Sequence, residues 1–286
     1  MNNIISDINK SHNKKNTLVF AGGGIKGFVF IGVIKYLEEL NIIKDIHTFI
    51  GTSIGGYISV LLSIGYAYQE IYSFIKLFNF ASSASLDIIN FFQNYAIDNC
   101  DNFIHIFKKL VEKKNIDPEI SLLELYKKTK KHIILVATCL NTKKAEYVSH
   151  ETFPEMPLCI AMRMTTCVPL LYPPVRYNDK IYVDGGLLDN FPIDYVKDRL
   201  NEVIGVNLIL PITNESSIDN IKEYILNIFE IFSVAFRKYD DNIYKNVVYN
   251  IPVNKKNPLD LSISLEEKKQ LVRDGYEFMK EKFSIN

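Results

Sequence analysis

A serine between two glycines is the first residue of this sequence whose setting indicates chemistry. Gly51-Thr52-Ser53-Ile54-Gly55 joins two apolar runs, which is the strand-to-helix context of a nucleophile elbow, G-x-S-x-G. Gly51 and Gly55 fit such a turn because the backbones of strand and helix nearly touch there. The helix N-terminus would favour negative charge on a substrate oxygen. The pattern predicts Ser53 as a nucleophile; a turn with a capping serine is the plainer alternative.

A second glycine motif lies upstream of the serine. In Gly22-Gly23-Gly24-Ile25-Lys26-Gly27 the N–H groups of Gly22, Gly23 and Gly24 can converge on an anion. In an acyl hydrolase they would form an oxyanion hole, in which each donor is worth ~3 kcal/mol. The segment also satisfies G-x-G-x-x-G, the fingerprint of a Rossmann-type dinucleotide-binding oxidoreductase. That alternative needs an acidic residue closing the second strand, where this sequence has Gly-Thr-Ser, so we favour the hydrolase.

A serine nucleophile needs a base, and the histidines do not supply one in a familiar order. The chain has five histidines, and none follows His150, whereas an α/β-hydrolase places its histidine last. We interpret His105 and His132 as surface or satisfied core residues. Asp184, in Asp184-Gly185-Gly186 at the end of a predicted strand, can take the serine proton directly. An Asp-Gly turn without chemistry is the alternative reading, and Asp189 is a weaker candidate base.

The elements that carry these motifs predict an α/β fold, a three-layer α/β/α sandwich with a mainly parallel central sheet. Each of the first two strands ends in a glycine motif and is followed by a helix. The predicted strands are residues 17–21, 47–50, 132–137, 145–148, 175–177, 180–183, 203–208 and 247–253. The predicted helices are residues 28–40, 54–64, 218–239 and 265–283, and residues 66–131 are mostly helical in pattern.

The chain is expected to form one catalytic domain, residues 17–210. A flexible leader, residues 1–16, precedes it, and a C-terminal helical part, residues 211–286, packs on the same domain. Residues 66–131 would be a helical insertion or lid region. Within it, residues 66–97 are rich in Phe, Tyr and Ile, which fits either a core or dimer contact or a membrane-facing lid.

Two further segments have patterns that predict their packing. Residues 163–174 contain three prolines and are expected to form a rigid loop. The 218–239 helix has apolar residues at 221, 225, 228, 232 and 235, and this spacing predicts a face buried against the sheet.

Composition excludes several classes of protein. Lys plus Arg and Asp plus Glu both number 33, so the net charge is zero and no overall field attracts nucleic acid. The four cysteines form no CxxC pair and have no histidine at zinc-ligand spacing, so we expect free thiols, no metal and no cofactor. The uncharged stretch 48–69 is as long as a membrane span, but its glycines indicate a buried strand, turn and helix instead. The N-terminus lacks a signal-peptide pattern, which favours a cytoplasmic protein.

The three motifs, taken in order, resemble those of the patatin-like phospholipases, which are related in catalytic design to cytosolic phospholipase A2. The matching segments are GGGIKG, GTSIG and DGG, the last continued as DGGLLDNFP, and the resemblance covers roughly residues 17–210. It implies a patatin-like sandwich with Ser53 as nucleophile, Asp184 as general base and Gly22 to Gly24 as the oxyanion hole. Lys26, Gly27, Gly51, Gly55, Gly185 and Gly186 support the motifs.

The resemblance also implies a function: hydrolysis of carboxylic esters in lipids, in the manner of a phospholipase A or lysophospholipase, without metal or cofactor. Met164 and Leu170 are bulkier than is usual in the family's proline loop and are expected to narrow the acyl pocket. The expected partner is a lipid at a membrane or micelle surface, with peripheral membrane contact and an undetermined oligomeric state. A catalytically silent lipid-binding module is the second alternative.

Overall fold

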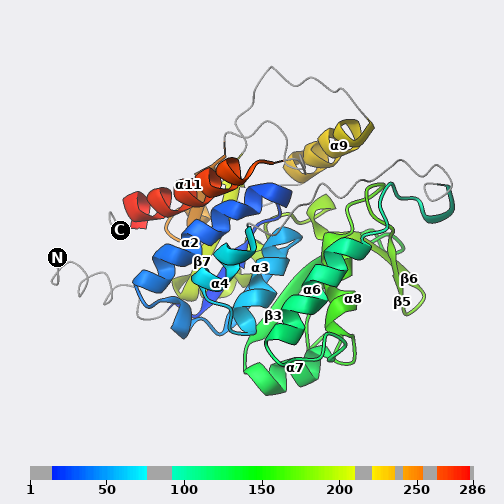
Figure 1. Ribbon diagram of the computed structural model, residues 1–286, viewed down its shortest axis with the longest axis horizontal. Coiled ribbons are helices and arrows are strands. Elements are labelled where there is room, and N and C mark those ends of the chain that lie inside the picture. Colours follow the sequence, from blue (N-terminus) through cyan, green and yellow to red (C-terminus); the bar gives the residue numbers. More distant parts are fainter. Residues whose placement is uncertain (1–14, 76–91, 210–220, 236–240, 254–262, 284–286) are drawn as a thin grey trace.

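The computed structural model describes residues 15–75, 92–209, 221–235, 241–253 and 263–283 (Figure 1). One eight-stranded sheet runs through it in the order β5-β6-β3-β2-β1-β7-β8, with β4 paired to β3 off this path. Its strands are β1 (Thr17–Phe20), β2 (Thr48–Thr52), β3 (His132–Cys139), β4 (Lys144–Val148), β5 (Val175–Tyr177), β6 (Lys180–Asp184), β7 (Val203–Ile209) and β8 (Val248–Pro252). The strands β3, β2, β1, β7 and β8 are mutually parallel, whereas β4, β5 and β6 pair antiparallel.

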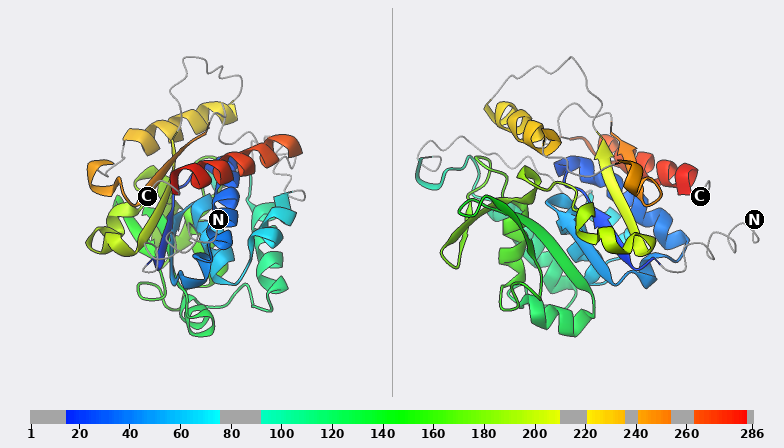
Figure 2. Two further views of the ribbon diagram at one scale, coloured as in Figure 1. Left: turned by 90° about the vertical axis from the view of Figure 1, so that its left-hand side faces the viewer. Right: turned by 180° about the vertical axis from the view of Figure 1, so that it is seen from behind.

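Helices cover both faces of the sheet, so the predicted α/β class is confirmed. The α-helices are α2 (Phe28–Glu39), α3 (Ile54–Ser63), α4 (Tyr68–Ile75), α6 (Asp101–Lys113), α7 (Leu122–Thr129), α8 (Leu158–Thr166), α9 (Ile221–Ala235), α10 (Asp241–Tyr244) and α11 (Leu265–Phe283). Short 3-10 helices are η1 (Gly24–Gly27), η2 (Ile43–Asp45), η3 (Gly185–Leu187) and η4 (Ile193–Glu202). In the left view of Figure 2, α2, α3 and α4 lie on one side of the sheet and η4 and α10 on the other.

The central strands are short apolar runs because both of their faces are covered. Every residue of β1 and β2 is buried, as expected for parallel strands between helical layers. The uncharged 48–69 stretch divides into β2, the turn at Ser53 and α3, in agreement with the interpretation from its glycines. Among the described residues, no helix has both the length and the apolar character needed to cross a bilayer.

The C-terminal helix α11 packs along α2 at unusually close range (Figure 1). A Cβ built on Gly32 would lie 2.0 Å from the carbonyl oxygen of Val272, and one on Gly275 would lie 2.1 Å from that of Val29. The two helices therefore meet backbone to backbone, with a glycine from each side at the crossing. This contact fixes α2, which begins directly after the first glycine motif.

The sequence patterns missed α8 and the four-residue helix α10. α8 covers Leu158–Thr166, so the first residues of the expected 163–174 loop are helical and the loop begins at Cys167. Its N-cap, Pro157, makes no side-chain cap hydrogen bond, and the helix is buried along most of its length. The cap signal and the polar face that normally reveal a helix are both absent from this segment.

The expected packing of the 218–239 helix was wrong. Of the face predicted to be buried, Ile225 is buried, whereas Ile221, Ile228 and Phe232 are 37–47% exposed. Ile225 belongs to a small second core with Ile97, Val168 and Leu171, next to the loop that follows α8. α9 covers η3 and this small cluster instead of the broad sheet, and so little apolar surface is available to bury its face.

The aromatic-rich segment 66–97 divides between core and surface where it is described. Tyr66 and Ile71 are buried, and Tyr68, Tyr72 and Phe74 pack against the main core. At the other end Phe92 is 74% and Tyr95 58% exposed, while Ala96 and Ile97 are buried. Residues 76–91, with Phe91, lie outside the described residues, so the lid assignment stays a prediction.

Candidate active site

Ser53 stands on a strained turn between β2 and α3. Its backbone has φ 54° and ψ −123°, a region that non-glycine residues rarely adopt and that marks a nucleophile elbow. A Cβ on Gly51 would lie 2.4 Å from the Gly55 carbonyl oxygen, and one on Gly55 would lie 2.5 Å from that of Ala21. The expectation that strand and helix nearly touch here is confirmed.

Two threonines hold this turn in place. The backbone N–H of Ser53 donates to Oγ1 of Thr165, at 3.0 Å, and the Oγ1 hydroxyl of Thr52 donates to the carbonyl of Asp189, at 2.9 Å. Thr165 comes from α8, a helix that the sequence patterns missed, so this contact was not anticipated. The two bonds attach the serine to α8 and to the segment that follows Asp184.

The sheet brings Asp184 to Ser53. On one edge of β3, Thr52 pairs with Val136 and Asp184 pairs with the next residue, Ala137. The other edge is occupied by β4, since Ala137 also pairs with Glu146. β2 and β6 therefore pair with the same edge of β3, one after the other. Ser53, which follows the end of β2, and Asp184, at the end of β6, lie where the two strands adjoin.

Asp184 is a buried carboxyl group with a strongly perturbed pKa. Its side chain is fully buried, and this burial raises its pKa from 3.8 to about 7, against smaller lowering effects from the Ser53 side chain and the Gly186 N–H. Oδ1 accepts the Gly186 N–H at 2.7 Å. Oδ2 is buried and accepts no hydrogen bond of ordinary length from the described residues, which leaves it for the Ser53 hydroxyl.

The glycine loop has fewer free backbone N–H donors than the three that the sequence predicted. The N–H of Gly22 donates to the carbonyl of Asn190 at 2.8 Å and is not available to a substrate. The N–H groups of Gly23 and Gly24 donate to no group in the part of the chain that the structure describes. The expected oxyanion set therefore reduces to Gly23 and Gly24. Lys26, in the same loop, is only 2% exposed.

Asn190 and Tyr147 are site residues that sequence reasoning missed. Beyond its main-chain contact, Asn190 places its amide against Gly22, with Nδ2 3.4 Å from the Gly22 carbonyl oxygen. Tyr147 donates its hydroxyl to Oδ2 of Asp189 at 2.7 Å, so the alternative base has another partner. Asn190 could have been found from the sequence, because it belongs to the DGGLLDNFP segment. No sequence motif includes Tyr147, which lies on β4.

An apolar pocket opens beside the glycine loop, between α2, α3, α4 and α6. Gly24 of the glycine loop and Ile54, the residue after Ser53, are part of its lining. Glycine, aliphatic and aromatic residues line it: Gly24, Ile25, Gly27, Phe28, Ile31, Ile54, Tyr57, Ile58, Leu61, Ile71, Phe74 and Leu110.

The expectation that Met164 and Leu170 narrow the acyl pocket stays a prediction, because the residues that line this pocket do not include them. Met164 is buried in the main core and Leu170 is 44% exposed. The four cysteines, as expected, are buried free thiols.

A serine at an elbow, a buried carboxyl group and a glycine loop on a mainly parallel sheet are the features expected of carboxylic ester hydrolases. Residues 18–197 match the family model of the patatin-like phospholipases, and the chain belongs to that family.

Individual relatives agree with this assignment. A probable lipid hydrolase of invertebrate iridescent virus 6 is 33% identical over 183 residues, which are 62% of this chain and 62% of the viral protein. The match thus spans less than two thirds of that relative. An intracellular phospholipase A2 of Caenorhabditis elegans is 28% identical over 71% of this chain, but over only 18% of its own length. The crystal structure of VipD from Legionella pneumophila shares the fold, with a TM-score of 0.65, 18% identity and coverage of 94% of this chain and 67% of VipD.

Proposed function

We propose that this protein is a lipid acyl hydrolase that cleaves carboxylic esters through Ser53 and Asp184. The observation that carries the proposal is the meeting of an elbow serine with a fully buried carboxyl group whose pKa is about 7. A base of that pKa is ionised often enough at neutral pH to accept a proton, and is basic enough to be effective. The Rossmann alternative is not retained, because the chain belongs to a hydrolase family.

In the first half-reaction Ser53 Oγ attacks the ester carbonyl carbon while its proton passes to Asp184. The carbonyl oxygen becomes an oxyanion, for which the N–H groups of Gly23 and Gly24 are the candidate donors. When the tetrahedral intermediate collapses, the bond to the alcohol oxygen breaks and Asp184 returns the proton to that oxygen. The products are the released alcohol and an acyl ester of Ser53.

In the second half-reaction water replaces the alcohol. Asp184 takes a proton from the water, whose oxygen attacks the acyl carbon, and the proton then returns to Ser53 Oγ as the fatty acid leaves. One carboxyl group serves as base and then acid in both halves, so no histidine is required. Consistent with this, the groups that act on the Asp184 carboxyl among the described residues are Ser53 and Gly186, and neither is a histidine.

The apolar pocket supports a lipid acyl chain as the acid part of the ester. Ligand pockets are lined mostly by hydrophobic and aromatic side chains, and the lining of this pocket consists of glycine, aliphatic and aromatic residues. A chain lying in it would pass between α2 and α3, next to the serine. Burial of each methylene contributes about 0.8 kcal/mol, which favours long acyl groups over acetyl esters.

We also propose that the mouth of the site contacts a lipid surface. Phe92 and Tyr95 are 74% and 58% exposed, and the adjoining Ile97 donates its backbone N–H to the carbonyl of Leu170. Leu170 lies in the loop whose Cys167 carbonyl accepts the N–H of Asp184. Two backbone hydrogen bonds thus connect the segment of the exposed aromatic residues to Asp184. Because the net charge of the chain is zero, apolar contact would supply most of the attraction between the protein and a lipid surface.

Labelling with a fluorophosphonate tests the proposal, because this probe reacts only with an activated serine. We expect the wild type to be labelled, Ser53→Ala to be unlabelled, and Asp184→Asn to react at least a hundredfold more slowly. A folded wild type that resists the probe would identify a silent lipid-binding module. Rapid labelling of Asp184→Asn would remove Asp184 as the base. Release of fatty acid from phospholipid, lysophospholipid and triacylglycerol then identifies the preferred lipid.

A further inference from the structure

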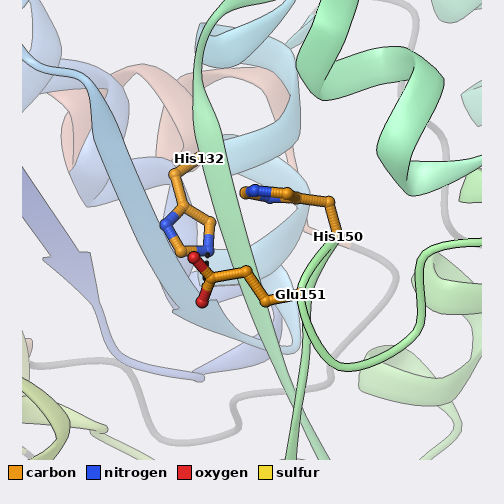
Figure 3. A group of neighbouring side chains, drawn as sticks. All are labelled: His132, His150 and Glu151. Carbon is orange, nitrogen blue, oxygen red and sulfur yellow. Dashed lines mark ion pairs between the residues drawn. The ribbon is translucent and has the colours of Figure 1, made fainter.

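Two histidines and a glutamate converge at the end of the sheet away from Ser53 (Figure 3). One ligand atom from each of His132, His150 and Glu151 lies within 4.8 Å of those of the other two. The Nε2 atom of His132 is 3.9 Å from Oε2 of Glu151. Two imidazoles and a carboxylate form a donor set that divalent transition-metal cations prefer and that Mg²⁺ and Ca²⁺ do not.

Strand pairing brings these three residues together. β3 begins at His132, and β4 pairs with it antiparallel, Leu135 opposite Val148. β4 ends at Val148, and His150 and Glu151 lie in the turn that follows it, within reach of His132. Ligands eighteen and nineteen residues apart in the chain thus meet in space, which is why no ligand spacing was visible in the sequence.

His132 has a buried nitrogen without a hydrogen-bond partner among the described residues, and His150 has a ring held in place by stacking. Nε2 of His132 is buried and has no hydrogen-bond partner in the described part of the chain, contrary to the expectation of a satisfied core histidine. The ring of His150 stacks on Tyr126, with centroids 3.8 Å apart and planes at 5°, and meets the His132 ring edge-on at 4.5 Å. The stacking fixes the His150 ring before any ligand arrives.

We infer that His132, His150 and Glu151 form a binding site for one divalent cation of the Zn²⁺ class. Ligand atoms around a tetrahedral zinc lie roughly 3.4 Å apart, given bonds of about 2.1 Å. The observed separations need to shrink by about 1 Å, and the side chain of Glu151 is 63% exposed and able to move. Three protein ligands leave the fourth position to water.

The charges around the three ligands determine how tightly the site would bind a cation. The charged and titratable groups that act on His132 are Glu151, His150 and Arg199. Glu151 supplies the anionic ligand, whereas the positive charge of Arg199 opposes a cation. We therefore expect weaker binding than at a closed site of four anionic or imidazole ligands.

The site is separate from the proposed catalysis. His132 pairs with Thr48, and Ser53 lies five residues further along the parallel neighbour, which is roughly 16 Å at 3.3 Å per residue. A cation there would join the start of β3 to the segment after β4. The expected effect is stabilisation of the fold, with no part in ester hydrolysis.

Titration of the chelator-treated full chain with Zn²⁺, followed by calorimetry, tests the inference. We expect one Zn²⁺ per chain, a rise in melting temperature with added Zn²⁺, and visible absorption bands of a four-coordinate site when Co²⁺ is used. Glu151→Gln should weaken Zn²⁺ binding at least tenfold, and His150→Ala should abolish it. Glu155→Gln, which removes a charge from an exposed neighbour on the same segment, should bind like the wild type.

Two results would overturn the inference. In the first, the wild type binds no Zn²⁺ and its melting temperature does not respond to the metal. In the second, Zn²⁺ binds with unchanged affinity in both Glu151→Gln and His150→Ala, which would place the metal at other histidines or cysteines. Circular dichroism of each variant shows whether it is folded, and Glu151→Gln, altered at an exposed side chain, keeps the test decisive if His150→Ala unfolds.

Discussion

The backbone N–H of Ser53 is bonded to Oγ1 of Thr165, which ties the nucleophile to a helix more than a hundred residues away in the chain. A strained backbone persists only where its surroundings hold it, and this bond is one of the restraints on the Ser53 turn. It also occupies the Ser53 N–H, which is therefore not an oxyanion donor in this arrangement.

Thr165→Val should therefore lower kcat for a short-chain ester by about tenfold, the equivalent of one hydrogen bond, with little change in KM. Thr166→Val is the matched control, because its hydroxyl bonds only to the Met162 carbonyl within α8. Steady-state kinetics and fluorophosphonate labelling rates measure both. Equal losses in the two variants would show that general damage to α8, and not the bond to Ser53, is responsible.

Activity should depend on the ionisation of Asp184. The base acts only when deprotonated, and burial raises its pKa to about 7, so kcat/KM should rise about tenfold per pH unit below 7 and level off above it. The profile is measured with a neutral soluble ester between pH 5 and 9, in ~0.5-unit steps. A flat profile through pH 7 would contradict this assignment of the base.

The same carboxyl group should destabilise the fold at high pH. The folded state keeps the Asp184 proton up to about pH 7, whereas the unfolded chain loses it near 3.8, so the folded state binds more protons between these values. The free energy of unfolding should fall by about 4 kcal/mol as pH rises across that interval. Asp184→Asn should lose this dependence and be the more stable protein at pH 8, by urea unfolding. If the wild type is as stable as the variant at pH 8, the ionised carboxylate carries no such penalty.

The pocket between α2 and α3 should set the preferred acyl length. Leu61→Phe adds volume to its lining and should reduce kcat/KM for long-chain esters several-fold while acetyl esters are spared. Leu62→Phe is the control, since Leu62 is buried but does not line the pocket, and both changes carry a similar overpacking cost of about 1–3 kcal/mol. Chain-length profiles that shift equally in both variants would exclude this pocket as the acyl site.

Exposed aromatic residues near the site mouth should matter only at a lipid surface. Phe92→Ser should lower hydrolysis of phospholipid vesicles and leave a soluble short-chain ester unaffected. Ile243→Ser on α10 removes another exposed apolar side chain, 61% exposed, and should change neither activity. Vesicle co-sedimentation provides a second measurement, and parallel loss on both substrates would contradict a surface role for Phe92.

Local signals in the sequence were enough for the elements that carry the motifs. The glycines around Ser53 predicted the elbow, Asn178-Asp179 predicted the hairpin between β5 and β6, and the 265–283 helix has the predicted limits. Each of these depends on neighbours in the chain. The hairpin turn, for example, has positive φ at both Asn178 and Asp179, which these two residue types tolerate.

Contacts between distant segments could not be predicted in the same way. Thr165 reaches Ser53 from a helix without a cap signal, and the carbonyl of Asn190 takes the N–H of Gly22 from across the site. Likewise His132 and Glu151 meet only because β4 turns back along β3. In each case the residue types give no signal of their own. The contact depends on strand register and helix placement, which composition and periodicity do not predict.

The close crossing of α2 and α11 joins the region shared with the family to a helix outside it. A chain cut after residue 197 would lose β7, the partner of β1, and would uncover the groove at Gly32 where the backbone of Gly275 and its neighbours now lies. Gly32 and Gly275 leave room for the backbone of the opposite helix, so either glycine has a packing role only while α2 and α11 remain in contact. Proteolytic removal of the last helix should therefore end activity by loosening α2 beneath the oxyanion loop, although the nucleophile and the base would both remain in the truncated chain.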